Sequence, residues 1–163
     1  MDSKPLENAT DDLGSAPARI ILMDLNVALS ENFEEMKKFS FVNFITGHEK
    51  FRLWLIDLLK NEYVIVITAR DSKWKEATLT RILEQSGWNP QESFFNDTGI
   101  PGADAPNIKK ALMEKYVLPV HGEKVNYLAI ESNANTRRMY KKLGIMAIDC
   151  LREGSWTEIS MSR

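Results

Sequence analysis

Short apolar segments alternate with longer amphipathic segments along most of this chain, and this alternation constrains its fold more than any other feature. Short continuous apolar runs are typical of strands buried on both faces of a parallel sheet. Segments with apolar residues three or four positions apart are typical of helices that pack on such a sheet. The expected strands are 19–23, 63–67, 93–95, 125–130 and 145–149, and the expected helices are 49–61, 72–85, 105–116 and 133–143. The alternation predicts an α/β fold with a mainly parallel sheet and helices on both faces.

Composition and charge limit the class of protein. A length of 163 residues fits one domain, and 44% hydrophobic with 27% charged residues is ordinary for a soluble globular protein. The net charge of −2 gives no overall attraction to nucleic acid, although a local basic patch stays open. One cysteine excludes an intramolecular disulfide and a cysteine-based metal site. Neither a signal-peptide pattern nor an apolar run of membrane-spanning length occurs, so we expect a cytoplasmic protein with no membrane partner.

The domain boundary is expected near residue 19. Residues 1–18 are polar and acidic without apolar periodicity, which predicts a flexible N-terminal tail before one domain over residues 19–163. Between the first strand and the first helix, residues 30–48 leave room for a short helix or flap, but not for a separate cap domain. The phenylalanines of this segment either pack over the sheet edge or stack on a nucleobase. A site without a large cap admits large substrates.

Mostly polar residues follow three of the predicted strands where each apolar run ends. They are Asp24-Leu25-Asn26, Thr68-Ala69-Arg70 and Glu131-Ser132-Asn133. Ligands of parallel α/β sheets bind beyond the carboxyl ends of the strands, so these side chains should meet at one edge. A carboxylate there can attack phosphorus or ligate Mg²⁺, and hydroxyl and amide groups can hold phosphate oxygens. Lys109 or Lys110, near the start of a predicted helix, offers the positive charge that a phosphate needs.

Each of these residues also has a purely structural interpretation. An aspartate after a strand often caps a turn, and Thr68 fits a helix N-cap. Glu131 fits the start of a helix, where the helix dipole favours an acid. Lys109 and Lys110, taken alone, are typical surface residues. Their order and their common position at strand ends favour a phosphate site over these separate interpretations.

Four segments together resemble the motifs of the haloacid dehalogenase (HAD) superfamily. MDLNVAL resembles the first motif, an apolar strand followed by Asp-x-Asp, and VIVITAR resembles the second, an apolar strand ending in Thr or Ser. NIKKAL resembles the lysine-bearing third motif, and YLAIESNANTRRMYKKLGI resembles the fourth. The stretch TARDSKWKEATLTRILEQSGW, with the SFFND after it, is similar to the 3′-phosphatase domain of polynucleotide kinase-phosphatases. The resemblance covers about residues 19–150 and implies a HAD-like Rossmannoid three-layer sandwich with a minimal cap.

The resemblance implies a role for each site residue. Asp24 would be the nucleophile that forms an aspartyl-phosphate, and its second oxygen would ligate Mg²⁺. Thr68 would bind the phosphoryl group. Lys109, or Lys110 if the register differs by one, would stabilise the developing charge. Glu131 would complete the Mg²⁺ shell.

Two departures from the family pattern bear on activity. Asn26 stands where the family's phosphatases usually carry a second Asp as general acid and base. An amide cannot donate and recover a proton in this way, although the backbone carbonyl of Asn26 can still ligate Mg²⁺. Glu131 and Ser132 stand where the fourth motif normally begins with one or two Asp. Two interpretations follow: an active Mg²⁺-dependent phosphomonoesterase, or a catalytically degenerate domain that binds a phosphorylated ligand or a protein.

The resemblance also indicates a class of substrate. Ala69 and Arg70 would contact the substrate beside Thr68, and Arg70 has the alternative of a surface ion pair. The expected partner is a phosphorylated small molecule, such as a nucleotide, or a nucleic-acid phosphate end. The sequence does not fix the oligomeric state.

Overall fold

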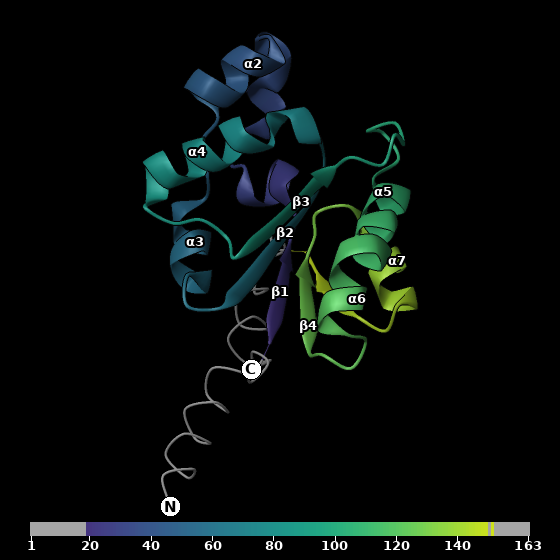
Figure 1. The fold of residues 1–163 in the computed structure, drawn as a ribbon. Coiled ribbons are helices and arrows are strands. Elements are labelled where there is room, and N and C mark those ends of the chain that lie inside the picture. The colour runs from purple at the N-terminus through teal and green to yellow at the C-terminus, as the bar shows by residue number, and fades with distance from the viewer. Residues whose placement is uncertain (1–18, 150, 152–163) are drawn as a thin grey trace, which may run out of the picture.

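A computed structural model describes residues 19–149 and Leu151, so the tail predicted over residues 1–18 lies outside the described residues. Within the described chain, five strands form one parallel sheet in the order β3-β2-β1-β4-β5 (Figure 1). The strands are β1 (Ile20–Met23), β2 (Tyr63–Asp71), β3 (Glu92–Asn96), β4 (Tyr127–Ile130) and β5 (Met146–Ile148). The predicted α/β fold with a parallel sheet is confirmed.

Helices and short helical turns connect the strands. In chain order they are η1 (Leu25–Leu29), η2 (Phe33–Lys38), α2 (Phe41–Asn43), η3 (Phe44–His48), α3 (Leu53–Leu59), η4 (Ser72–Trp74), α4 (Lys75–Ser86), α5 (Ala105–Leu112), η5 (Met113–Val117), α6 (Leu118–His121) and α7 (Ala134–Lys142). Helices α3 and α4 pack on one face of the sheet, and α5 and α7 pack on the other. None of the helices in the described part of the chain is long and apolar enough to cross a membrane.

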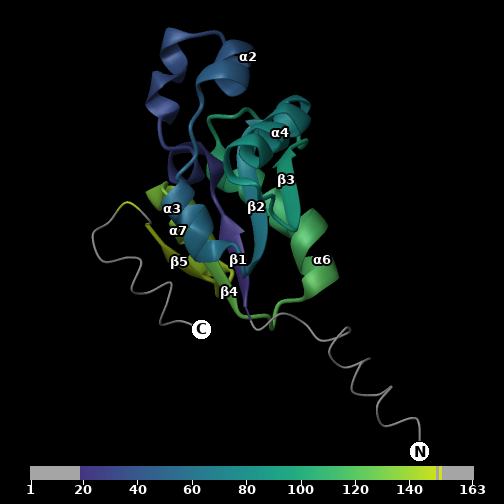
Figure 2. The same ribbon diagram turned by 90° about the vertical axis from the view of Figure 1, so that its left-hand side faces the viewer.

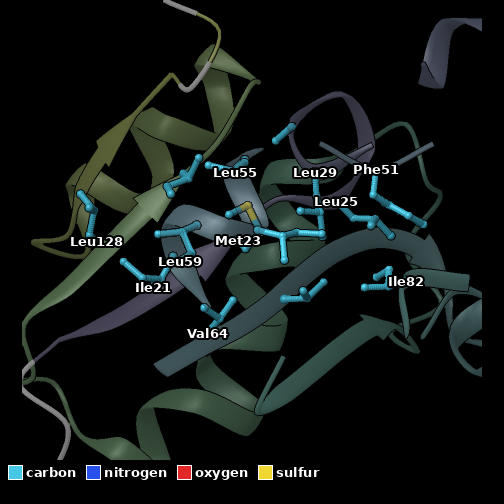
Figure 3. Packing of buried hydrophobic residues seen from close by; sticks show 14 of the residues in the cluster. Ile21, Met23, Leu25, Leu29, Phe51, Leu55, Leu59, Val64, Ile82 and Leu128 are labelled. Carbon is cyan, nitrogen blue, oxygen red and sulfur yellow. The ribbon is translucent and has the colours of Figure 1, made fainter. Parts of the chain in front are cut away.

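The central strand β1 shows why the sheet is covered on both faces. Successive side chains of a strand point to opposite faces. Ile21 and Met23 belong to the cluster that includes Leu55 of α3 (Figure 3), whereas Ile20 and Leu22 belong to the cluster on the α5 side. Each of these four β1 side chains is at most 1% exposed. The continuous apolar run of the sequence therefore reflects burial on both faces.

The segment between β1 and α3 lies beyond the carboxyl edge of the sheet. Figure 2 shows α2 at the end of the molecule to which the strands run. An antiparallel bridge between Ser30 and Phe51 joins the two ends of the segment. Asn32 strengthens this closure, since its side chain donates to the His48 carbonyl at 2.9 Å and accepts from the Lys50 N–H at 2.8 Å. Between the bridged residues, η2, α2 and η3 therefore form short helical turns that are tied together at their base.

The first long helix is shorter than the predicted range of residues 49–61. It begins at Leu53 because the residues before it make other contacts. Phe51 pairs with Ser30, and its N–H donates to the Gln85 side chain at 3.0 Å. Apolar spacing alone did not indicate these contacts with distant residues.

Strand β2 extends beyond the predicted range of residues 63–67 and ends at Asp71. Its pairing with β3 shifts register between Ile67 and Asp71. Within this irregularity, Thr68 Oγ1 accepts a hydrogen bond from the Arg70 N–H at 3.0 Å. The strand therefore carries Thr68 and Arg70 into the edge where the site residues meet.

Candidate functional site

Lys109 joins two carboxylates at the carboxyl edge of the sheet. Its Nζ donates to Asp24 Oδ1 at 2.7 Å and to Glu131 Oε1 at 2.5 Å. Asp24 directly follows β1, Glu131 follows the neighbouring strand β4, and Lys109 belongs to α5. The three residues are only 6%, 2% and 2% exposed. Lys110, the alternative in the third motif, is exposed on the surface.

Burial and charge act on Lys109 in opposite directions. Burial alone lowers its pKa, because an ammonium group loses hydration, but the Asp24 and Glu131 carboxylates raise the pKa above its ordinary value. Lys109 therefore carries its positive charge. Burial raises the pKa of Glu131 to about 7, the charge of Lys109 opposes this rise, and the charge of Asp24 adds to it. With Lys109 protonated, the three groups carry one net negative charge when both carboxylates are ionised and no net charge when Glu131 is protonated.

Ser132 supplies the second contact to Asp24. Its hydroxyl donates to Asp24 Oδ2 at 2.7 Å, and the same hydroxyl lies 3.5 Å from the backbone oxygen of Asn26. Both oxygens of Asp24 are thus held by donors, one by Lys109 and one by Ser132. The sequence predicts Ser132 at the same edge of the sheet but indicates no contact of its hydroxyl with Asp24. The one feature of the sequence that bears on this contact is the position of Ser132 directly after Glu131, at the end of a strand beside β1.

The turn after Asp24 adopts an unusual backbone conformation. Val27 has a φ of +72°, in the left-handed region that a β-branched residue rarely adopts. Arg52 holds this turn, since its Nη2 donates to the Val27 carbonyl at 3.0 Å and its Nε donates to the Ala28 carbonyl at 2.8 Å. The side-chain oxygen of Asn26 accepts from Arg70 Nη2 at 3.0 Å. The turn is therefore fixed from two sides.

Arg70 is buried in a network of polar and aromatic contacts. It donates to both carboxylate oxygens of Glu49, and its Nη1 also donates to Thr78 Oγ1 at 2.9 Å. Its guanidinium carbon lies 5.9 Å from the ring centroid of Phe33 and 5.3 Å from that of Phe41. Arg70 thus ties the end of β2 to the segment beyond the sheet edge.

Thr68, Ala69 and Arg70 occupy different environments within one turn. Thr68 is fully buried, and its hydroxyl holds the Arg70 N–H. Ala69 and Arg70 line a cavity of about 650 Å³, which Asn26 also lines. Neither Asp24 nor Thr68 contributes to the described wall of this cavity. The cavity therefore adjoins the Asp24 centre through the Asn26 turn.

Several oxygen atoms lie near Asp24. Asp24 Oδ2 and the Asn26 carbonyl face the same Ser132 hydroxyl, and the Glu131 carboxylate lies on the other side of Lys109. Within the described residues, no group of three or more His, Cys, Asp and Glu side chains is arranged to hold a metal ion. The oxygen donors present are the two carboxylates and the Asn26 carbonyl, and Mg²⁺ generally takes such ligands together with water.

No family model and no curated protein matches the chain. A functional assignment therefore rests on the geometry of these residues and on the motifs that carry the resemblance.

Proposed function

We propose that the protein is a Mg²⁺-assisted phosphomonoesterase of the HAD type that acts through an aspartyl-phosphate on Asp24. The observation that supports this most strongly is the contact of one buried lysine, Lys109, with both Asp24 and Glu131, at 2.7 and 2.5 Å. A carboxylate nucleophile, a cation and a second carboxylate then share the sheet edge where ligands of parallel α/β folds bind.

The proposed reaction has two displacements at phosphorus. An Asp24 oxygen attacks phosphorus, the bond from phosphorus to the ester oxygen breaks, and the leaving oxygen takes a proton from water. A second water then attacks phosphorus and gives up a proton to the hydroxide left by the first step, the bond to Asp24 breaks, and inorganic phosphate leaves. Lys109 contacts Asp24 at 2.7 Å and offsets negative charge on the phosphoryl oxygens. Bound by Asp24, Glu131 and the Asn26 carbonyl, Mg²⁺ would further neutralise that charge.

The substrate that we propose is a nucleotide or a nucleic-acid phosphate end. This part of the proposal rests on the resemblance of residues 68–88 to the 3′-phosphatase branch. The segment over residues 30–48 forms only short helices and therefore no large cap over the sheet edge. An edge without a large cap can admit a substrate as large as a nucleic-acid end.

A second candidate function is a module that binds a phosphorylated ligand without turnover. The contact that favours it is the hydrogen bond from Arg70 Nη2 to Asn26 Oδ1 at 3.0 Å. Asn26 offers an amide where a phosphatase uses a carboxyl group, and Arg70 already holds that amide. The loss of general acid–base help lowers a rate by roughly 10²–10⁴-fold.

Phosphate release from p-nitrophenyl phosphate and nucleoside monophosphates, with and without Mg²⁺, tests the proposal. We expect Mg²⁺-dependent release by wild type and by Lys110→Met, and loss of release in Asp24→Asn and Lys109→Met. Lys110→Met is the matched control, because it removes the same charge from the next residue, which is exposed. Equal release by wild type and Asp24→Asn would contradict the nucleophile. Ligand binding without release would favour the binding module.

A further inference from the structure

The cavity of about 650 Å³ beside the Asp24 centre has no part in the reaction as proposed. Its wall is formed by the Asn26 turn, the end of β2, η4 and the loop that follows β3. Two of its wall residues border the proposed phosphate site. Asn26 lies two residues after Asp24, and Ala69 directly follows Thr68. A group attached to a phosphate at Asp24 would therefore enter this cavity.

One side of the cavity is aromatic. Phe41 of α2 and Trp74 of η4 both line it, with their ring planes 7° apart and their centroids 5.4 Å apart. Both rings are only partly buried, although an offset-stacked pair of this size usually belongs to a core or an interface. The Arg70 guanidinium, 5.3 Å from the Phe41 centroid, fixes the wall from within. Lys73 Nζ lies 5.3 Å from the Trp74 centroid on an exposed side chain that a planar ligand can displace.

The charges of the described wall residues do not favour a second phosphate in the cavity. Arg70 is the one cation among its described wall residues, and the buried Glu49 carboxylate takes up that charge. The wall also carries the carboxylates of Asp71 and Asp97. One oxygen of Asp71 accepts from the Lys73 N–H at 2.9 Å. One oxygen of Asp97 accepts from the Tyr116 hydroxyl and lies 3.9 Å from Lys115 Nζ. The second oxygen of each carboxylate can accept a hydrogen bond from an N–H donor of a ligand. An uncharged ligand with exocyclic amino groups satisfies these conditions.

We infer that the cavity binds a nucleobase, as the planar part of a substrate whose phosphate lies at Asp24. This inference rests on the proposed function and deepens it by naming the group that determines specificity. A nucleobase is flat, uncharged and bears N–H donors, which match the ring pair and the carboxylates. The cavity volume lies within the range of small-molecule sites.

Equilibrium binding by calorimetry in EDTA, which halts Mg²⁺-dependent turnover, tests the inference. The ligands are adenosine 3′- and 5′-monophosphate and ribose 5-phosphate, which lacks the base. We expect wild type to bind one or both adenosine monophosphates about tenfold more tightly than ribose 5-phosphate, as stacking on an aromatic side chain predicts. Trp74→Leu and Phe41→Leu should each reduce this preference. Trp54→Leu is the matched control, because Trp54 is 44% exposed on α3 and does not line the cavity.

The outcomes separate this inference from the proposed function. A base preference that falls in Trp74→Leu or Phe41→Leu but persists in Trp54→Leu supports the nucleobase site, even without hydrolysis by wild type in Mg²⁺. Equal affinities for all three ligands, no binding of any of them, or a preference unchanged in both cavity variants would overturn it. If the protein hydrolyses ribose 5-phosphate but binds it as tightly as the adenosine monophosphates, the proposed phosphatase function stands and the nucleobase site is rejected. Thermal unfolding shows whether each variant is folded. If one cavity variant is not folded, the ligand affinities of the other cavity variant test the inference.

Discussion

Arg70 donates to both carboxylate oxygens of Glu49, at 2.6 and 2.9 Å, and neither side chain is exposed to solvent. The pair spans 21 residues of sequence and also holds Asn26 through the same guanidinium. It therefore connects the segment beyond the sheet edge, the end of β2 and the turn after Asp24. Removing one partner of a buried pair leaves the other charge uncompensated, which costs more than the loss of an exposed pair.

Glu49→Gln should lower the free energy of unfolding by about 3–5 kcal/mol, because it leaves the Arg70 guanidinium buried without its counter-charge. Urea unfolding followed by circular dichroism measures the change. Glu34→Gln is the control, since Glu34 is an exposed acid of the same segment and its loss should change stability by less than about 0.5 kcal/mol. Equal effects of the two substitutions would contradict the role given to the buried pair.

Val27→Gly should raise the free energy of unfolding by about 1 kcal/mol. Strain of roughly 1–3 kcal/mol at a φ of +72° is relieved, while glycine costs roughly 0.5–1 kcal/mol in chain entropy. Val42→Gly provides the comparison, because Val42 is an exposed valine in helix α2 and should only destabilise. A loss of stability in Val27→Gly as large as that in Val42→Gly would show that the turn is not strained.

The sheet and the meeting of strand ends could be predicted because they follow from local patterns. Buried parallel strands produce continuous apolar runs, and strands that run in one direction end at one edge. This logic predicted that Asp24, Thr68 and Glu131 lie at one edge of the sheet, and Lys109 contacts two of them, Asp24 and Glu131. Lys109 is buried with Ile108 and Leu112 on the inward face of α5. The apolar spacing of this helix is therefore consistent with a buried lysine at position 109.

The remaining features depend on how distant segments pack. Nothing near Glu49 in the sequence indicates Arg70 as its partner, so the first helix was predicted to begin too early. The contact of the Ser132 hydroxyl with Asp24 depends on the spacing of β1 and β4. Val27 has a positive φ, which β-branched residues usually avoid, so its own residue type does not predict this turn. The turn is held by contacts from a distant residue, such as the hydrogen bond from Arg52 to the Val27 carbonyl.

Asn26→Asp should raise the phosphatase turnover number by about 10²-fold or more. A carboxyl group at this position can donate a proton to the leaving oxygen and take one from the attacking water, which an amide cannot do. Steady-state hydrolysis of a nucleoside monophosphate at saturating Mg²⁺ measures the effect. Asn26→Ala should give no increase. Identical turnover in Asn26→Asp and wild type would rule out the missing acid–base group as the limit on the rate.

The metal-free protein should lose stability as pH rises from about 4.5 to 7. Burial raises the pKa of Glu131 from 4.5 to about 7, so the folded state binds a proton more tightly than the unfolded chain over this range. Stability is then greatest at the acidic end and falls by up to about 3 kcal/mol. Glu131→Gln should remove this component, which urea unfolding at a series of pH values measures. If the free energy of unfolding depends on pH in the same way in wild type and Glu131→Gln, the raised pKa of Glu131 is contradicted.

The most direct test of the central claim is the detection of phosphate covalently attached to Asp24. Wild-type protein is mixed with Mg²⁺ and a nucleoside monophosphate, quenched in acid during turnover, and mapped by mass spectrometry of its peptides. We predict a phosphorylated peptide containing residues 20–29 in wild type and Lys110→Met, and none in Asp24→Asn. Turnover without that adduct, or an adduct on another residue, would contradict Asp24 as the nucleophile.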